Sequence, residues 1–260
     1  MNEIFGKHQI TPGNTKHFPV GDFSIWLKRE KEGWYILQTN SPVPSDEQPD
    51  FFQGNLYGTN AEYFQTGKSN SIILAPALPA KPIVFKGSQL KISPKQKFTF
   101  FLKIPLTVQI YYSKNAAENL LKEIPSRRLS DTWFGEPDSG EAAFTIGNHY
   151  DLYFEAVESS PFDAICPVSV FNNSANALEI QRQIIRVENL SLYKNAGKMV
   201  TSMVEVEYKG QQVLSSADYH YSKIYDGEKQ EIVTKPRNTS GKNLLKINFH
   251  FIKNMYKNEI

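Results

Sequence analysis

Apolar and polar residues alternate along several stretches of the chain, and this period of two is typical of half-buried β-strands. The pattern is clearest over residues 23–28 and recurs over 178–188, where Arg182 and Arg186 fall on the same face. It appears again over 245–251, close to the C-terminal end. One apolar and one polar face on each strand predicts antiparallel sheets with one side turned toward a core.

Other runs rich in β-branched and aromatic residues also predict strands. They lie between short glycine-containing turn signals. These further strands are expected at 34–38, 71–74, 83–85, 98–104, 106–112, 142–146, 165–171 and 199–206. The sequence therefore predicts an all-β fold with an antiparallel β-sandwich architecture.

One segment departs from the strand pattern. Residues 115–123 carry alanine and leucine at helical spacing, and Pro125 follows as a stop signal, so a short helix is expected there. We interpret it as the connection between two packed β-domains, an N-terminal one at 1–125 and a C-terminal one at 126–260.

The charge distribution supports a division near this point. The formal net charge is only +2, but residues 81–128 contain ten Lys or Arg and two acids, whereas residues 131–163 contain eight acids and no Lys or Arg. Such blocks are typical of two solvated surfaces, or of two faces that contact different partners. The overall balance argues against a dedicated nucleic-acid-binding protein, and we expect no nucleic-acid partner.

The ends and the cysteine content narrow the setting. No signal-peptide pattern opens the sequence, and no apolar stretch reaches the roughly 20 residues that a membrane span needs. We therefore expect a soluble, cytoplasmic protein without a membrane span. The single Cys166 lies in an apolar run and is expected to be a buried, inert thiol.

Common enzyme signatures are missing from the chain. It has no dinucleotide-binding glycine cluster, no nucleophile elbow and no paired-histidine zinc motif. We predict neither a cofactor nor a metal site from these patterns.

The segment 127–141 concentrates residues that could carry chemistry. It combines a Trp-Phe pair, two arginines, two glycines and four carboxylates within 15 positions, and its Glu-Pro-Asp-Ser-Gly stretch is typical of a tight turn. The candidate ligand-binding residues are Arg127, Arg128, Trp133, Glu136, Asp138 and Glu141.

Three interpretations of this segment are open. In the first, Trp133 and Phe134 fill the core and Arg127 or Arg128 pairs with the turn carboxylates. In the second, Trp133 is a stacking platform with polar contacts around it, as in sugar or cation sites. In the third, two carboxylates act as the acid and the base or nucleophile of a hydrolase.

The same segment, from Leu129 to Glu141, resembles the core motif of a prokaryotic family called domain of unknown function 432. Similar flanking pieces are Ile124-Pro125, Ile165-Cys166-Pro167-Val168, Asn172-Asn173-Ser174 and the run 178–193. The resemblance extends over nearly the whole chain, and it implies no activity, cofactor or catalytic residue.

Together these observations predict a non-catalytic β-sandwich binding or interaction protein, with a protein partner or a small ligand. The alternative is a carboxylate-dependent hydrolase of sugars or phosphoesters, centred on Trp133–Glu141. A raised carboxylate pKa in a cleft would favour the hydrolase, and an exposed turn would favour binding.

Overall fold

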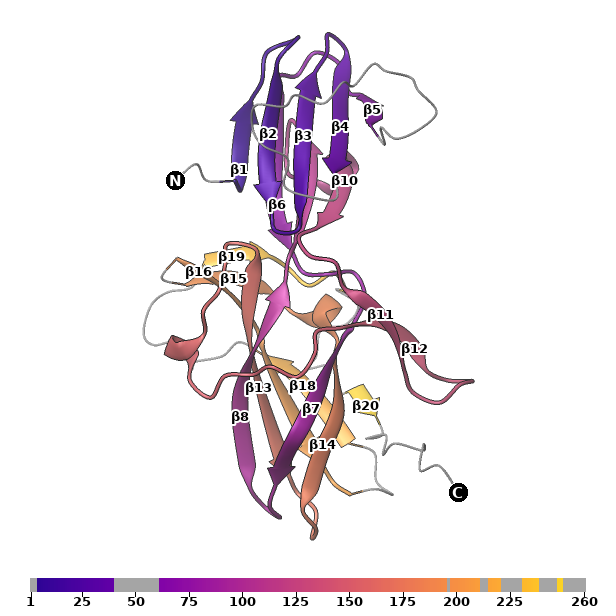
Figure 1. The fold of residues 1–260 in the computed structure, drawn as a ribbon, viewed down its shortest axis with the longest axis vertical. Helices are drawn as coiled ribbons and strands as arrows, with labels where there is room; N and C mark the ends of the chain where they lie inside the picture. Colours follow the sequence, from indigo (N-terminus) through magenta and orange to yellow (C-terminus); the bar gives the residue numbers. More distant parts are fainter. Residues whose placement is uncertain are drawn as a thin grey trace. The chain divides into compact units, whose positions relative to one another are not determined.

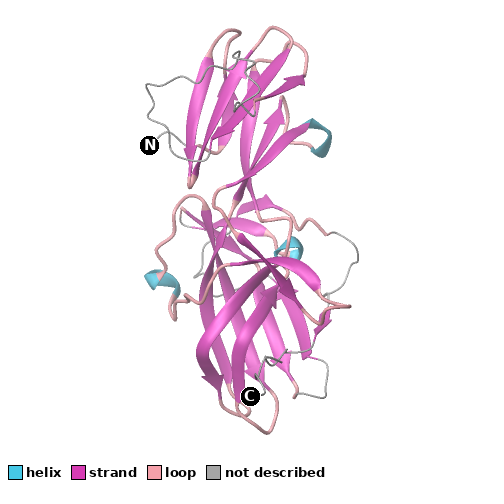
Figure 2. Ribbon diagram, turned by 45° about the vertical axis from the view of Figure 1, so that its right-hand side comes forward, coloured by secondary structure: helices cyan, strands magenta, loops and turns pink. Residues whose placement is uncertain are grey.

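The fold is built almost entirely of β-strands (Figures 1 and 2). The structure is a computed structural model, and it describes residues 4–39, 61–195, 197–210, 215–220, 231–238 and 247–249. The chain forms two compact units. Unit 1 contains Met1–Ala77 and Pro105–Arg128, and unit 2 contains Leu78–Ile104 and Leu129–Ile260. The all-β fold predicted from the alternation is confirmed.

The domain boundary predicted at 125/126 remains a prediction. The two compact units differ from it because the segment Leu78–Ile104 belongs to unit 2, so the chain passes between the units three times. The last of these passages lies between Arg128 and Leu129, at the reversal of charge.

Unit 1 contains two four-stranded sheets whose pairings are all antiparallel. One has the order β1 (Gly6–Gln9), β6 (Ser71–Ala77), β9 (Thr107–Tyr112), β10 (Leu120–Pro125). The other has the order β2 (Thr15–Val20), β3 (Phe23–Arg29), β4 (Gly33–Thr39), β5 (Glu62–Gln65).

Strand β3 is buried on both faces, whereas its alternation predicts one polar face. Ile25, Leu27 and Arg29 on one face are fully buried, and so is Trp26 on the other. The buried guanidinium is satisfied by backbone oxygens, since Arg29 donates to the carbonyl of Gly33 at 2.6 Å and to that of Gly67 at 2.9 Å. Hydrogen bonding of this kind offsets the cost of removing a charge from water.

The helix predicted at 115–123 is wrong. Only Ala117–Asn119 form a single 3₁₀ turn, and Leu120 opens β10, which pairs antiparallel with β9. A helix of nine residues is marginal by itself because nucleation is costly. A strand in this place is stabilised by hydrogen bonds to β9 and by burial of Ile124, so the sheet prevails over local spacing. Two further 3₁₀ turns lie at Phe154–Ala156 and Val187–Asn189.

Unit 2 also contains two sheets. The smaller has the order β11 (Ser130–Phe134), β12 (Glu141–Thr145), β7 (Ile83–Ile92), β14 (Leu178–Ile185). The larger has the order β19 (Glu231–Thr234), β15 (Leu192–Asn195), β16 (Lys198–Thr201), β13 (Asp163–Asn172), β17 (Met203–Tyr208), β18 (Ser215–His220), β20 (Ile247–Phe249), with β8 (Lys97–Pro105) also paired to β13.

The two sheets of unit 2 meet through aromatic side chains. Phe85 on β7 and Phe100 on β8 are fully buried, with ring centroids 5.4 Å apart. The sheets are mixed rather than purely antiparallel, because β12 pairs parallel to β7 and β13 pairs parallel to β16 and β17. Of the strand predicted at 245–251, β20 covers 247–249, and the remaining positions lie outside the described residues.

No helix among the described residues is long and apolar enough to cross a membrane.

Candidate functional site

The segment singled out in the sequence forms an antiparallel hairpin in unit 2. Strands β11 and β12 lie side by side (Figure 1), and Trp133 pairs with Ala142 and Phe134 with Glu141. Residues 135–140 make the turn between the strands, as the Pro and Gly positions predict. Strand β11 is the outermost strand of its sheet.

The turn is organised around one backbone oxygen. The carbonyl of Glu136 accepts hydrogen bonds from the amide of Gly140 at 2.8 Å and from the indole Nε1 of Trp133 at 3.0 Å. A Cβ atom at Gly140 would lie 2.3 Å from that indole nitrogen, so only glycine allows the ring to settle here. Gly135 has a φ of 117°, a conformation that favours glycine.

The two aromatic residues of the hairpin have opposite environments. Phe134 is 6% exposed and packs with Val84, Ala143 and Ile184. Trp133 is 47% exposed and presents its ring on the surface, held by the bond to Glu136. The interpretation that places both rings in the core is therefore right for Phe134 and wrong for Trp133.

Two arginines of the β14 segment fasten the hairpin to the sheet. Arg182 donates from Nη2 to the carbonyl oxygen of Trp133 at 2.6 Å and to the hydroxyl of Thr132 at 3.1 Å. Its guanidinium also lies 5.5 Å from the centre of the Phe134 ring. The hydrogen bond from Arg182 therefore fixes the backbone of Trp133 in the hairpin.

Arg186 holds the other strand of the hairpin. It forms a two-pronged ion pair with Glu141, with Nη1 2.6 Å from Oε2 and Nη2 bound to Oε1. Pairs of this geometry are among the stronger ion pairs in proteins. The alternation over 178–188 placed Arg182 and Arg186 on one face, but it gave no sign that this face meets the hairpin.

Burial shifts the pKa values of the groups around this ion pair. Burial by itself lowers the pKa of Arg186, but the hydrogen bond and charge of Glu141 outweigh it, so the pKa is raised. Burial also raises the pKa of Glu188, whose carboxylate lies 3.9 Å from Arg186, and that of Tyr219. Glu141 is therefore committed to an ion pair and not open to a substrate.

The six candidate residues do not form one cluster within either unit. Arg127 and Arg128 end unit 1, where the amide of Arg128 donates to Asp22 at 3.1 Å. The other four lie on the hairpin of unit 2, with the carboxylates of Glu136 and Asp138 exposed on its turn. Glu141 is paired with Arg186, and the pairing of Arg127 or Arg128 with the turn carboxylates stays a prediction.

Other chemistry is sparse in the described part of the chain. There, no three His, Cys, Asp or Glu side chains are grouped so that they could hold a metal ion. Cys166 is buried, as expected, and burial raises the pKa of its thiol to about 12. A thiol of this kind is protonated at neutral pH and unreactive.

The flanking piece Asn172-Asn173-Ser174 has a structural role. Asn172 is fully buried, and its amide donates to the carbonyls of Ile92 at 2.9 Å and Asn176 at 2.8 Å. Its side-chain oxygen accepts from the hydroxyl of Ser174 at 2.8 Å. Asn172 therefore ties the end of β13 to the end of β7.

A family model described as "Protein of unknown function (DUF432)" matches residues 4–253. The match confirms the resemblance that the hairpin segment and its flanking pieces indicate. No curated protein and no solved structure matches the chain.

Proposed function

We propose a function for this chain, which belongs to the family of proteins of unknown function DUF432. The family description names no activity, so the proposal is argued from the geometry of the chain. The proposal is a non-catalytic binding protein that contacts its partner through the β11–β12 hairpin. Trp133 supplies the apolar contact, and Glu136 and Asp138 supply charge beside it.

The exposed and fixed indole of Trp133 carries this proposal. Leaving the apolar surface of a tryptophan ring in water is unfavourable, and tryptophan is enriched among the residues that dominate binding interfaces. Here the ring is held by the carbonyl of Glu136 at 3.0 Å, while Arg182 holds the backbone of Trp133 at 2.6 Å. A ring already fixed in place loses little conformational freedom when a partner covers it.

The charge near the hairpin favours a basic partner segment. Glu136 and Asp138 are exposed on the turn, whereas Asp131 is paired with Lys81 and Glu141 with Arg186. Complementary charge accelerates association and selects the partner, while the buried ring contributes affinity. We therefore propose a protein partner with a basic segment that carries an apolar side chain.

Nothing in the geometry favours the hydrolase alternative over binding. Glu141 is neutralised by Arg186, and the two remaining turn carboxylates are exposed rather than held in a cleft. A general acid at neutral pH needs surroundings that raise its pKa. Hydrolysis remains an untested alternative, and the cytoplasmic location remains a prediction.

Affinity enrichment with immobilised protein tests the proposal. The comparison uses the wild type, Trp133→Ala, the double variant Glu136→Gln/Asp138→Asn, and Tyr153→Ala. Tyr153 is 69% exposed in the same unit but lies outside the hairpin, so its variant is the matched control.

We expect at least one protein that the wild type and Tyr153→Ala retain and that Trp133→Ala loses. Its affinity, measured after purification, should fall in the double variant and weaken with added salt. Equal retention by Trp133→Ala and the wild type would contradict the hairpin as the contact surface.

A further inference from the structure

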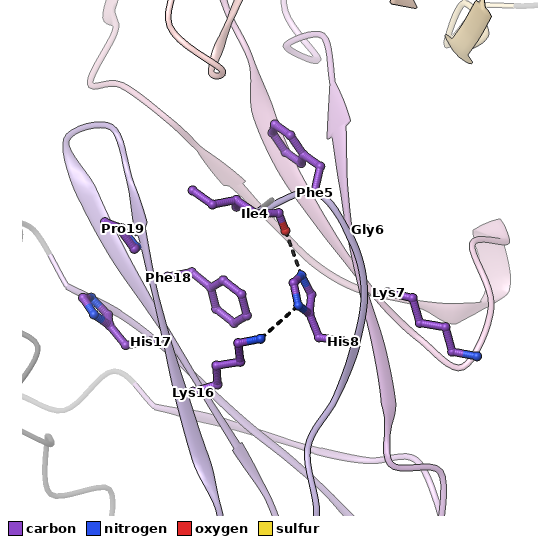
Figure 3. Close-up of a pocket in the computed structure, with 9 residues that line it drawn as sticks. All are labelled: Ile4, Phe5, Gly6, Lys7, His8, Lys16, His17, Phe18 and Pro19. Atoms are coloured by element: carbon purple, nitrogen blue, oxygen red, sulfur yellow. Dashed lines mark hydrogen bonds between the residues drawn. The ribbon is translucent and has the colours of Figure 1, made fainter. Parts of the chain in front are cut away.

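A pocket of about 510 Å³ lies in unit 1 between two edge strands. Strand β1 is the outermost strand of one sheet and β2 is the outermost strand of the other. The chain turns between them at residues 10–14, so the two strands diverge into different sheets. The walls of the pocket include Ile4, Phe5, His8, Lys16, Phe18 and Pro19 (Figure 3).

His8 stands at the centre of this pocket with both ring nitrogens engaged. Nε2 lies 2.8 Å from the carbonyl oxygen of Ile4, and Nδ1 lies 3.2 Å from Nζ of Lys16. A carbonyl only accepts and an ammonium only donates, so Nε2 carries the proton and Nδ1 accepts. The ring is therefore neutral and fixed, and it directs the Lys16 ammonium into place.

Lys16 brings a positive charge to the pocket. Its Nζ lies 5.1 Å from the centre of the Phe18 ring. No carboxylate forms an ion pair with Lys16 within the part of the chain that the structure describes. An ammonium has three donors, and the bond to His8 uses one of them. The other donors and the charge suit an anion.

The other walls are apolar except for Lys7 and His17. Ile4, Phe5, Phe18 and Pro19 line the pocket, and His8 contacts Phe18 edge to face with ring centroids 4.7 Å apart. A pocket of this volume is typical of small-molecule sites, which combine apolar walls with a few fixed polar groups. Among its described lining residues there is no acid.

We propose that this pocket binds a small organic carboxylate that carries an aromatic or aliphatic group. The carboxylate pairs with the ammonium of Lys16, and the apolar group lies against Phe18 and Ile4. The sequence showed no motif here, since Lys16 and His8 meet only through the fold. The site is separate from the hairpin and does not depend on the proposed function.

Titration calorimetry with benzoate as the probe tests this site. Benzamide has the same shape without the charge, and inorganic phosphate has charge without the apolar group. We expect benzoate to bind more tightly than either of them. A charge-assisted hydrogen bond contributes enough that losing it weakens binding by about tenfold or more.

The variants are Lys16→Met, Lys16→Arg and Lys68→Met. Lys16→Met should remove the preference for benzoate over benzamide, and Lys16→Arg should keep it. Lys68 is the matched control, because it is an exposed lysine of the same unit outside the pocket lining, and Lys68→Met should bind as the wild type does.

Thermal unfolding of each variant shows whether it is folded before binding is compared. Failure of Lys16→Met to fold would leave Lys16→Arg and the benzoate–benzamide comparison in the wild type as the decisive measurements. Equal binding of benzoate and benzamide to the wild type, no benzoate binding at all, or an equal loss in Lys68→Met would overturn the proposal.

Discussion

Neighbouring residues on the hairpin have opposite roles, and substitution separates them. Phe134 is 6% exposed within an apolar cluster, whereas Trp133 is 47% exposed. Phe134→Ala should lower the free energy of unfolding by about 3 to 5 kcal/mol because it leaves a cavity. Trp133→Ala should lower it by less than about 1 kcal/mol. Urea unfolding of both variants measures the difference, and similar losses would contradict the exposed position of Trp133.

The histidine in the pocket makes the stability of the protein depend on pH. Burial lowers the pKa of His8 and that of His17 below the ordinary value of about 6.5. The unfolded chain therefore takes up protons before the folded one does as the pH falls. Stability is full above about pH 6.5 and declines as the pH drops toward the lowered pKa values.

We expect the melting temperature to fall between about pH 7 and about pH 5, and to fall less in His8→Gln. His17 stays in that variant, so part of the decline should remain. Scanning calorimetry across this range measures the effect. A variant with the same slope as the wild type would show that His8 does not titrate in this way.

At the level of elements, the hairpin depends on its ion pair with the β14 segment. Arg186 and Glu141 are 23% and 33% exposed, whereas the surface pair Lys97 and Glu205 is 50% and 36% exposed. Exposed pairs contribute about 0 to 1 kcal/mol because solvent screens them. A double-mutant cycle with Arg186→Met and Glu141→Gln should give a larger coupling, about 1 to 3 kcal/mol.

The matched cycle uses Lys97→Met and Glu205→Gln. Equal coupling energies in the two cycles would mean that Arg186 does not fasten the hairpin. Chemical denaturation of the wild type and the six variants gives all seven free energies.

The strands show how far the sequence predicts these elements. The runs at 98–104 and 165–171 lie in β8 and β13, as their β-branched and aromatic residues predict, and most of their side chains are buried. The segment 115–123 was mispredicted because its partner strand β9 determines its structure, and local spacing contains no record of that pairing. The same limit explains why β3 is buried on both faces.

The candidate site was predictable only in part for the same reason. Its turn has local chemistry, so the stretch from Glu136 to Gly140 was predicted as a turn. Which aromatic ring faces the core depends on the register with β12, and the arginines come from a strand that is distant in sequence. The pocket of Lys16 and His8 gave no local signal, because it exists only where two sheet edges meet.

At the scale of the whole molecule, each unit has its own core and its own candidate site. Unit 1 contains the cationic pocket between β1 and β2, and unit 2 contains the hairpin with Trp133. Neither site shows the paired carboxylates or activated nucleophile of an enzyme. We therefore propose binding for both sites, and the hairpin site depends on the exposure of Trp133 on the surface.

Acrylamide quenching of tryptophan fluorescence tests the exposure of Trp133. Of the three tryptophans, Trp26 is 2% exposed, Trp34 is 0% exposed and Trp133 is 47% exposed. The wild type should show a readily quenched component, and Trp133→Phe should lack it and emit at shorter wavelength. Equal quenching of the two proteins would contradict this exposure, because Trp133 would then be buried like the other two tryptophans.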